Sequence, residues 1–174
     1  LLSNKYLSGE ISVLTEGIYK PNTYHFKLGY PRMKLLKRMK TAQDISLNTV
    51  WKNKPKNFIL KNKYELLILA SIIQKEAKSF EDSKLVASVF INRLRKKMKL
   101  QSDVTLAYGL NINGKYITKK MLQSPHPFNT YFYSGLPPKP ISYPGDNALN
   151  AINNFTDTNY LYFVADGNGG HRFS

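Results

Sequence analysis

The sequence predicts a single α+β domain built around a central pair of helices, with short strands and long loops. The chain has 174 residues, of which 42% are hydrophobic, so it is long enough to bury a core as one domain. Two helical patterns follow each other in its middle, at residues 64–78 and 79–94. Six of the nine prolines lie in residues 123–174, which favours loops and short elements there.

The first third of the chain predicts little regular structure. Residues 10–30 alternate loosely between apolar and polar and are interrupted by glycine and proline, a pattern typical of strand and loop. Residues 33–38 are compatible with a short basic helix. Residues 48–63 mix Asn, Lys and Pro and predict a connection.

The central helices have clear apolar stripes. The first stripe predicts a buried helix, and its members are Leu66, Leu67, Leu69, Ile72 and Ile73. Ser79 with Asp82 three residues later predicts the start of the second helix, because such side chains satisfy free N–H groups there. The second stripe stops at Leu94, and the basic run 95–99 suits the negative end of a helix dipole.

The last part predicts turns alternating with short elements. We expect a turn at 111–114, a short helix at 118–122, a loop at 125–145, a helix around 149–152, and a strand at 160–165 closed by a turn at 166–170.

Composition excludes some classes of site. The chain has no cysteine, so disulfide scaffolds, thiolate zinc sites and cysteine nucleophiles are ruled out. The three histidines lack the spacing of a metal motif, and we expect no metal. The longest apolar run, residues 66–73, is far shorter than the ~20 residues of a membrane span. The chain starts at Leu1 rather than Met, and we expect it to be a fragment.

The net charge of +15 indicates an anionic partner, and it is unevenly distributed. Residues 1–62 carry +9 (12 basic, 3 acidic), residues 63–122 carry +7 (12 and 5), and residues 123–174 carry −1 (2 and 3). Nucleic acid, a membrane surface and an acidic polymer all fit this charge, as does general basicity with no specific partner.

Glu76 is the candidate catalytic residue in this pattern. It follows Ile73, Ile72 and Leu69 at helical spacing, so it lies at the end of the apolar stripe. Desolvation there would raise its pKa and keep a proton available near neutral pH, as a general acid requires. The alternative is a structural glutamate that reaches solvent or pairs with Lys75, Lys78 or Arg93.

Six blocks of sequence follow one another in a characteristic order. Two of them lie on the central helices, LASIIQKE (69–76) and VASVFINRL (86–94). The other blocks are EG with PNTY (16–17, 21–24), LQSDVT with YG (100–105, 108–109), NTY with GLPPKPI (129–131, 135–141), and YLYFVADG with GH (160–167, 170–171). In this order they resemble the YceG-like endolytic murein transglycosylases, whose corresponding helical segments read LASIIxKE and VAxVFxNRL. The resemblance covers roughly residues 15–174. Val104 stands where the family usually has Pro, which bears on the turn after Asp103.

The resemblance implies that residues 1–174 form one catalytic domain with short strands and long loops lining a glycan cleft. The family's membrane helix, LysM-like region and C-terminal tail lie outside the chain. The implied reaction cleaves the β-1,4 bond between N-acetylmuramic acid (MurNAc) and N-acetylglucosamine (GlcNAc) inside glycan strands. The MurNAc C6 hydroxyl attacks C1, leaves a 1,6-anhydro end and limits strand elongation. A single carboxyl group suffices, whereas ordinary glycosidases need two.

The resemblance also assigns roles to residues. Glu76 matches the family's catalytic glutamate. We expect Gln101, Asp103 and Thr105 to bind sugar and orient Glu76, although turn and cap hydrogen bonds explain them too. The further candidates are Asn129 for an acetamido group and Tyr131 for stacking on a sugar, although simple loop structure explains both as well. Tyr108 and His171 are lesser candidates, and Arg93 is expected to pair with a carboxylate, either within the protein or on the substrate.

The implied setting is the outer side of the inner (cytoplasmic) membrane, with a single-pass anchor. Peptidoglycan strands are the expected partner, with peptidoglycan synthases as further partners, and neither nucleic acid nor a cofactor is expected. Two alternatives stay open. One is a two-carboxylate glycan hydrolase that uses Glu76 and Asp103. The other is a basic module that binds nucleic acid or an anionic envelope polymer without catalysis.

Overall fold

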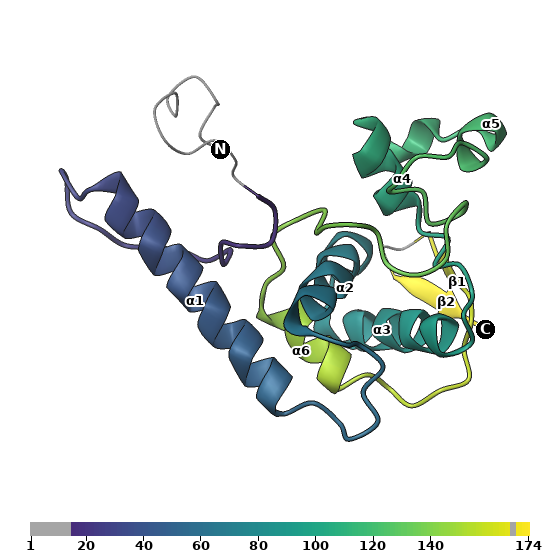
Figure 1. Cartoon of the computed structure of the whole chain (residues 1–174), viewed down its shortest axis with the longest axis horizontal. Coiled ribbons are helices and arrows are strands. Elements are labelled where there is room, and N and C mark those ends of the chain that lie inside the picture. The colour runs from purple at the N-terminus through teal and green to yellow at the C-terminus, as the bar shows by residue number, and fades with distance from the viewer. Residues whose placement is uncertain (1–14, 168–169) are drawn as a thin grey trace.

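A computed structural model describes residues 15–167 and 170–174, and Figure 1 shows the arrangement of its elements. The long helix α1 (Arg32–Lys52) lies along one side, against α2 (Lys63–Glu76) and α6 (Asp146–Asn153). Helix α3 (Phe80–Arg95) packs on α2 and α6. At the other end lie α4 (Asp103–Leu110), the 3-10 turn η2 (Gly114–Tyr116) and α5 (Lys119–Leu122). The α+β class expected from the sequence is confirmed.

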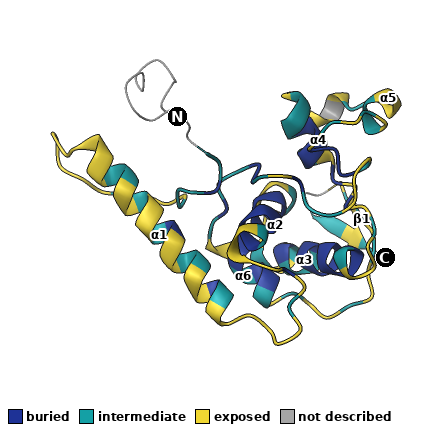
Figure 2. Ribbon diagram, viewed as in Figure 1, coloured by how far each residue is buried: buried dark blue, intermediate teal, exposed yellow. Residues whose placement is uncertain are grey.

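Helix α2 is the centre of the core. Eight consecutive residues, 66–73, are buried, because α1, α3, α4 and α6 all contact this helix (Figure 2). Ser71 is the polar member of this run. Its hydroxyl donates to the carbonyl of Ile68 (2.7 Å) and accepts the N–H of Ile141 (3.0 Å), so the Pro-rich loop is fastened to the core. A buried hydroxyl is thereby satisfied in both of its roles.

The predicted start of the second helix is confirmed. The Ser79 hydroxyl accepts the N–H of Asp82 at 3.1 Å, as an N-cap does. Asn62 caps α2 in the same way through the N–H of Glu65. Only residues 77–79 separate the two helices, so the end of α2 and the start of α3 lie close together.

Several expectations for the flanking regions are wrong. Residues 15–30 contain no strand, and residues 10–14 lie outside the described part. The short helix expected at 33–38 is the first part of the 21-residue α1, which also takes up the start of the expected connection at 48–63. Only Gln43 and Val50 of α1 are buried, so the helix has almost no apolar stripe for a sequence pattern to detect. Helix α4 was also not expected.

The two strands form one antiparallel hairpin. β1 (Phe163–Ala165) is shorter than the expected 160–165, and β2 (His171–Phe173) was not expected. Phe163 pairs with Phe173 and Ala165 with His171. The turn expected at 166–170 is described only at its ends, where the Asp166 N–H donates to the Gly170 carbonyl at 3.0 Å.

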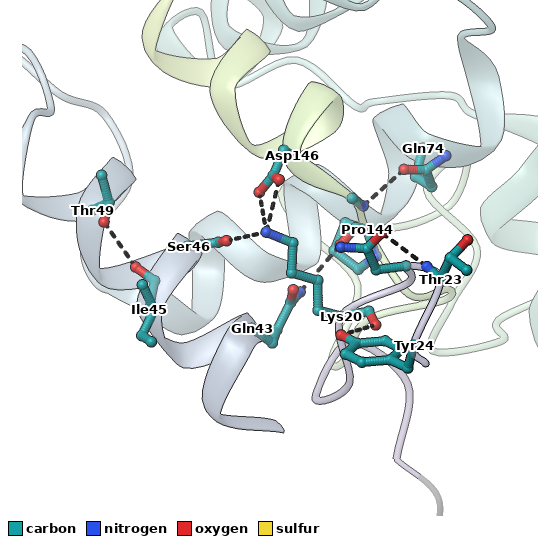
Figure 3. A network of polar contacts seen from close by, with 12 residues as sticks. Lys20, Thr23, Tyr24, Gln43, Ile45, Ser46, Thr49, Gln74, Pro144 and Asp146 are labelled. Carbon is teal, nitrogen blue, oxygen red and sulfur yellow. Dashed lines mark hydrogen bonds and ion pairs between the residues drawn. The ribbon is translucent and has the colours of Figure 1, made fainter. Parts of the chain in front are cut away.

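Lys20 joins three separate parts of the chain (Figure 3). Its ammonium group donates to the Ser46 hydroxyl of α1 (2.7 Å) and lies 2.7 Å from a carboxylate oxygen of Asp146 at the start of α6. Nearby, the buried Gln43 side chain donates to the Pro144 carbonyl at 3.2 Å. These contacts hold the N-terminal segment and α1 against α6.

Within the described residues, none of the helices combines the length and the apolar character that a bilayer crossing requires.

Candidate active site

Glu76 is the last residue of α2, where the helix leaves the core. Its carboxyl group is partly buried, and this burial raises its pKa above the usual range. A hydrogen bond from Ser102 and the charge of His171 lower the pKa and offset part of that effect, whereas Asp103 and Asp82 raise it. Burial outweighs the opposing contributions, so the pKa of Glu76 is raised overall.

Ser102 supplies the hydrogen bond to this carboxyl group. Its Oγ lies 2.5 Å from Glu76 Oε1 and donates to it. Ser102 occupies the N-cap position of α4, where a serine hydroxyl usually accepts a backbone N–H of the first turn. It makes no such cap bond here. The hydroxyl is used for the carboxyl group instead of for the helix.

A ring of hydrogen bonds fixes the Ser102 backbone. The Ser102 N–H donates to Thr130 Oγ1 (3.0 Å), and its carbonyl accepts from Thr105 Oγ1 (2.7 Å). The two threonine hydroxyls are 2.8 Å apart. Because the Thr105 proton goes to the Ser102 carbonyl, Thr130 must donate to Thr105. Ser102, Thr105 and Thr130 are all buried, so these bonds fix the position of Ser102 next to Glu76.

A partly buried histidine–aspartate pair lies near Glu76 and acts on its charge. His171 of β2 places Nδ1 at 3.0 Å from Asp82 Oδ2, in the first turn of α3. An ionised carboxylate can only accept, so Nδ1 carries the proton. Phe163 packs edge-on against the imidazole at 5.0 Å between ring centroids. The hairpin and the start of α3 are thus joined next to the carboxyl group.

Asp103 and Tyr131 complete the polar surroundings. The Tyr131 hydroxyl donates to Asp103 Oδ1 at 2.7 Å. Burial and this carboxylate raise the pKa of Tyr131 well above its usual range. Asp103 is the first residue of α4, so it follows Ser102 directly in the chain. Both carboxyl groups, Glu76 and Asp103, therefore meet at the start of one helix.

Asp103 also lines an open cavity of about 800 Å³ between α4 and the segments around it. The other polar side chains on its wall are Glu16, Lys75, Tyr108, Asn111, Asn113, His126 and Lys139. Burial and the neighbouring Glu16 carboxylate raise the pKa of Tyr108 to about 12. The Tyr108 ring packs on Phe128 at 5.0 Å. A cavity of this size is large enough for a ligand, and its wall includes Asp103, whose charge acts on Glu76, but not Glu76 itself.

A comparison with known protein families matches residues 3–174 of the chain to the YceG-like family. The chain belongs to the YceG-like family. Two curated relatives are named endolytic murein transglycosylase. The one from Bacillus subtilis is 34% identical over 171 residues, which are 97% of this chain and 46% of the relative. The one from Streptococcus pneumoniae (serotype 2) is 36% identical over 157 residues, 87% of this chain and 28% of the relative.

A crystal structure of a yceG-like protein from Listeria monocytogenes has the same fold. Its TM-score is 0.78 at 37% identity, over 91% of this chain and 52% of that one. The chain thus spans less than half the length of the curated relatives described above, and about half of the Listeria protein.

Two of the site residues expected from the YceG-like resemblance are internal. Asn129 is fully buried, and its amide donates to the carbonyls of Met121, Leu122 and Ser124. Its Oδ1 accepts the Tyr131 N–H at 3.0 Å. Thr105 is equally buried and holds Ser102. Both residues can therefore act on a ligand only through the backbone that they hold in place.

Gln101 and Arg93 contact each other. Arg93 Nη1 donates to Gln101 Oε1 at 3.1 Å, and its Nε donates to the Leu161 carbonyl at 2.6 Å. Further Arg93 bonds reach the carbonyls of Lys99 and Leu100. Arg93 has no ion pair with a carboxylate within the described residues, because its guanidinium is buried against backbone carbonyls, and its pairing with a carboxylate of the substrate stays a prediction. Gln101 has no recorded bond to Glu76.

Val104, the departure from the YceG-like pattern, has a simple explanation. Helix α4 begins at Asp103, so Val104 lies in its first turn. Backbone N–H groups there have no intrahelical acceptor, and Pro is tolerated for that reason. Either residue fits this position.

Sequence reasoning missed Ser102 and Asp82 as parts of the site. Ser102 lies between the candidates Gln101 and Asp103, in a segment that the sequence pattern leaves without a predicted helix. Asp82 was assigned to the first turn of α3, a place it does occupy. Neither position carries a signal for its second role, because each partner is distant in sequence.

Proposed function

We propose that this chain is the catalytic domain of an endolytic lytic transglycosylase that cleaves MurNAc-β-1,4-GlcNAc bonds within peptidoglycan strands. The observation that carries this proposal is the partly buried Glu76 carboxyl group with raised pKa and one fixed hydrogen-bond donor. The names of the relatives from Bacillus and Streptococcus support the same activity. The chain spans less than half the length of either relative, so the activity of the whole protein is also part of what we propose.

Glu76 acts first as general acid and then as general base. Its proton passes to the glycosidic oxygen, and the bond from that oxygen to C1 of MurNAc breaks. The MurNAc C6 hydroxyl attacks C1 and gives its proton to the Glu76 carboxylate, which restores the acid. The new C6–O–C1 bond closes the 1,6-anhydro ring, and no water is consumed. One carboxyl group therefore serves both steps, and the reaction as written requires no cofactor.

Ser102 decides which oxygen of Glu76 carries the proton. Its hydroxyl donates to Oε1, and an oxygen that accepts this bond is the poorer site for a proton. The acidic proton is thereby directed to Oε2. Orientation of this kind contributes because the bound sugar must meet the proton within hydrogen-bond distance.

The remaining residues bind or position the glycan in this proposal. Tyr108 and Asp103 contact sugars in the cavity, and Tyr131 presents its ring at the same edge. Gln101 is exposed and contacts sugar from the segment before α4. His171 holds the hairpin beside Glu76 through Asp82. Thr105 and Asn129 support the cleft from inside.

The substrate places this activity outside the cytoplasm, because peptidoglycan is an extracytoplasmic polymer. We propose that the full protein is anchored by one span in the cytoplasmic membrane with this domain on the outer side. There it limits strand elongation, and so affects cell shape, next to peptidoglycan synthases. The +15 charge draws the domain to an acidic envelope.

The test is a digest of purified peptidoglycan followed by mass spectrometry of the products. We expect the wild-type chain to give 1,6-anhydro ends, each lighter by one water than the hydrolysis product. Glu76→Gln should lower the rate by a factor of about 100 to 10,000. Glu81→Gln, an exposed glutamate in the first turn of α3, is the matched control and should keep full activity. Full activity of Glu76→Gln would overturn the proposal.

The two-carboxylate hydrolase is the less favoured alternative to this transglycosylase, because the relatives from Bacillus and Streptococcus are named transglycosylases. The same digest decides between them, since products that have gained one water would identify hydrolysis.

A further inference from the structure

An apolar tip projects at the N-terminal end of α1, away from the core. It consists of Phe26, Leu28, Tyr30 and Met33, and Figure 1 shows this end of α1 on the side of the molecule opposite α4. Leu28 is fully exposed, Phe26 is 57% exposed and Met33 62% exposed. Single exposed apolar side chains are ordinary, but four within eight residues form a patch that requires an explanation.

The backbone of the tip holds Leu28 in solvent. The Tyr30 N–H donates to the Lys27 carbonyl at 3.1 Å and closes a tight turn with Leu28 and Gly29 at its apex. Gly29 has φ +80°, a left-handed conformation that favours glycine. Among the described residues, no atom lies within 4 Å of the place that a Cβ at Gly29 would take, so this side of the turn is open. Leu28 thus cannot turn inward without breaking the turn.

The loop that carries the tip is braced against α1. The Arg38 guanidinium donates to the His25 carbonyl at 3.2 Å and lies over the Tyr24 ring at 5.5 Å. Helix α1 in turn packs on α2 and α6. The tip is therefore presented at a fixed place relative to the core.

A basic collar surrounds the tip, formed by Lys27, Arg32, Lys34 and Lys37, all exposed. Residues 17–43 contain seven Lys or Arg and no Asp or Glu. None of the four collar side chains has a hydrogen bond or ion pair within the described residues. Beside the collar, an open groove of about 480 Å³ runs along α1 between Lys34 and Ile45.

We propose that the apolar tip and its basic collar dock this domain on an anionic lipid bilayer. Leu28 and Phe26 enter the boundary between headgroups and acyl chains, and Tyr30 lies at headgroup level. The collar ammonium and guanidinium groups bind lipid phosphates. A protein partner is less favoured, because it would need an acidic rim around an apolar pocket. An anionic bilayer has negatively charged headgroups above apolar acyl chains over its whole surface.

This inference goes beyond the proposed glycan cleavage and does not depend on it. The collar gives long-range attraction that salt screens, and the tip gives short-range insertion that salt leaves in place. The two contributions can therefore be separated by experiment.

The test is co-sedimentation of the chain with vesicles of phosphatidylglycerol and phosphatidylcholine, against vesicles of phosphatidylcholine alone. We expect binding to the anionic vesicles only. Leu28→Asp and the double variant Lys34→Glu/Lys37→Glu should each weaken it by about tenfold or more. Leu28 is fully exposed, so this variant should unfold at the wild-type temperature.

A matched control separates the collar from general basicity. Lys96→Glu/Lys99→Glu, after α3, has the same net charge as the collar variant but lies away from the apolar tip, and should keep most of the binding. Equal loss in both double variants would overturn the proposal, as would an unchanged affinity of Leu28→Asp. A dimer in solution that Leu28→Asp dissolves would also overturn it, since the occupant would then be a second copy of the chain.

Discussion

The hydroxyl of Ser102 donates a 2.5 Å hydrogen bond to the carboxyl group of Glu76, 26 residues earlier in the chain. This bond favours the charged form of Glu76 and so lowers its pKa against the opposing effect of burial. The Ser102 hydroxyl thus opposes protonation of the Glu76 carboxyl group, whereas its burial promotes protonation. The balance between them sets the pH range in which Glu76 can act as an acid.

Ser102→Ala should move the alkaline limit of activity to higher pH. Without the hydrogen bond the Glu76 pKa rises further, and a general acid works only while it is protonated. The maximal rate should fall by about tenfold because the proton is no longer directed to one oxygen. Ser102→Thr keeps the hydroxyl and should restore both the rate and the pH profile. A rate loss with an unmoved profile would mean that Ser102 acts only on the fold.

Asp103→Asn should move the alkaline limit of activity to lower pH. The Asp103 charge raises the pKa of Glu76, so its removal lowers that pKa and activity declines at lower pH. The Tyr131 hydroxyl can still donate to the Asn oxygen, so the rate should fall by less than about tenfold. The measurement is kcat against pH with product masses. A hydrolase that needs both carboxylates would instead lose a factor of about 100 or more.

Glu76→Gln should make the protein more stable at alkaline pH. The raised pKa means that folded Glu76 binds its proton up to a higher pH than in the unfolded chain. Between the two pKa values the folded state holds more protons, so the stability of the wild type falls as pH rises. Glutamine carries no charge and can still accept from Ser102. The unfolding temperatures of the wild type and the variant should agree near pH 4, and that of the variant should be higher at pH 8. A lower unfolding temperature of the variant at pH 8 would contradict this prediction.

Lys20→Met should lower the free energy of unfolding at neutral pH by about 1 kcal/mol. This value is modest because Asp146 is half exposed and solvent screens its charge. Burial alone would raise the Asp146 pKa, but bonds to Lys20 and Ser46 and the Lys20 charge lower it overall. The stabilisation is therefore present above the usual aspartate pKa and is lost as pH falls through the folded one. Lys40→Met, which removes an exposed pair with Asp44, should cost only a few tenths of a kcal/mol by urea unfolding.

The sequence could predict those elements whose burial is one-sided or complete. Helices α2 and α3 were expected because their apolar residues repeat at helical spacing, and Ser79 signals a cap by itself. Only the first part of helix α1 was expected, at residues 33–38, because the helix buries only two residues and lies mostly in solvent. β2 could not be found, since its three residues are defined by pairing with β1 rather than by their own pattern.

The candidate site was predictable in part for the same reason. Glu76 ends an apolar stripe, and that is visible in a single helix. The bond from Ser102 and the pair Asp82–His171 depend on tertiary contacts between residues 26 and 89 positions apart. No local pattern reports such contacts. Asn129 is the opposite case: the YceG-like resemblance suggested that it binds a ligand, but its side-chain amide is taken up by hydrogen bonds within its own loop.

The bonds of Arg93 have a consequence for the time at which the site becomes complete during synthesis. One guanidinium joins the Leu161 carbonyl, just before the hairpin, to the Leu100 carbonyl, just before Ser102. A ribosome-bound chain that has reached α4 already holds Glu76 and Ser102 but has neither strand of the hairpin. Its Asp82 then lacks His171, and Arg93 lacks the Leu161 carbonyl. The carboxyl group thus acquires its full set of neighbours only when the last residues described here emerge and dock.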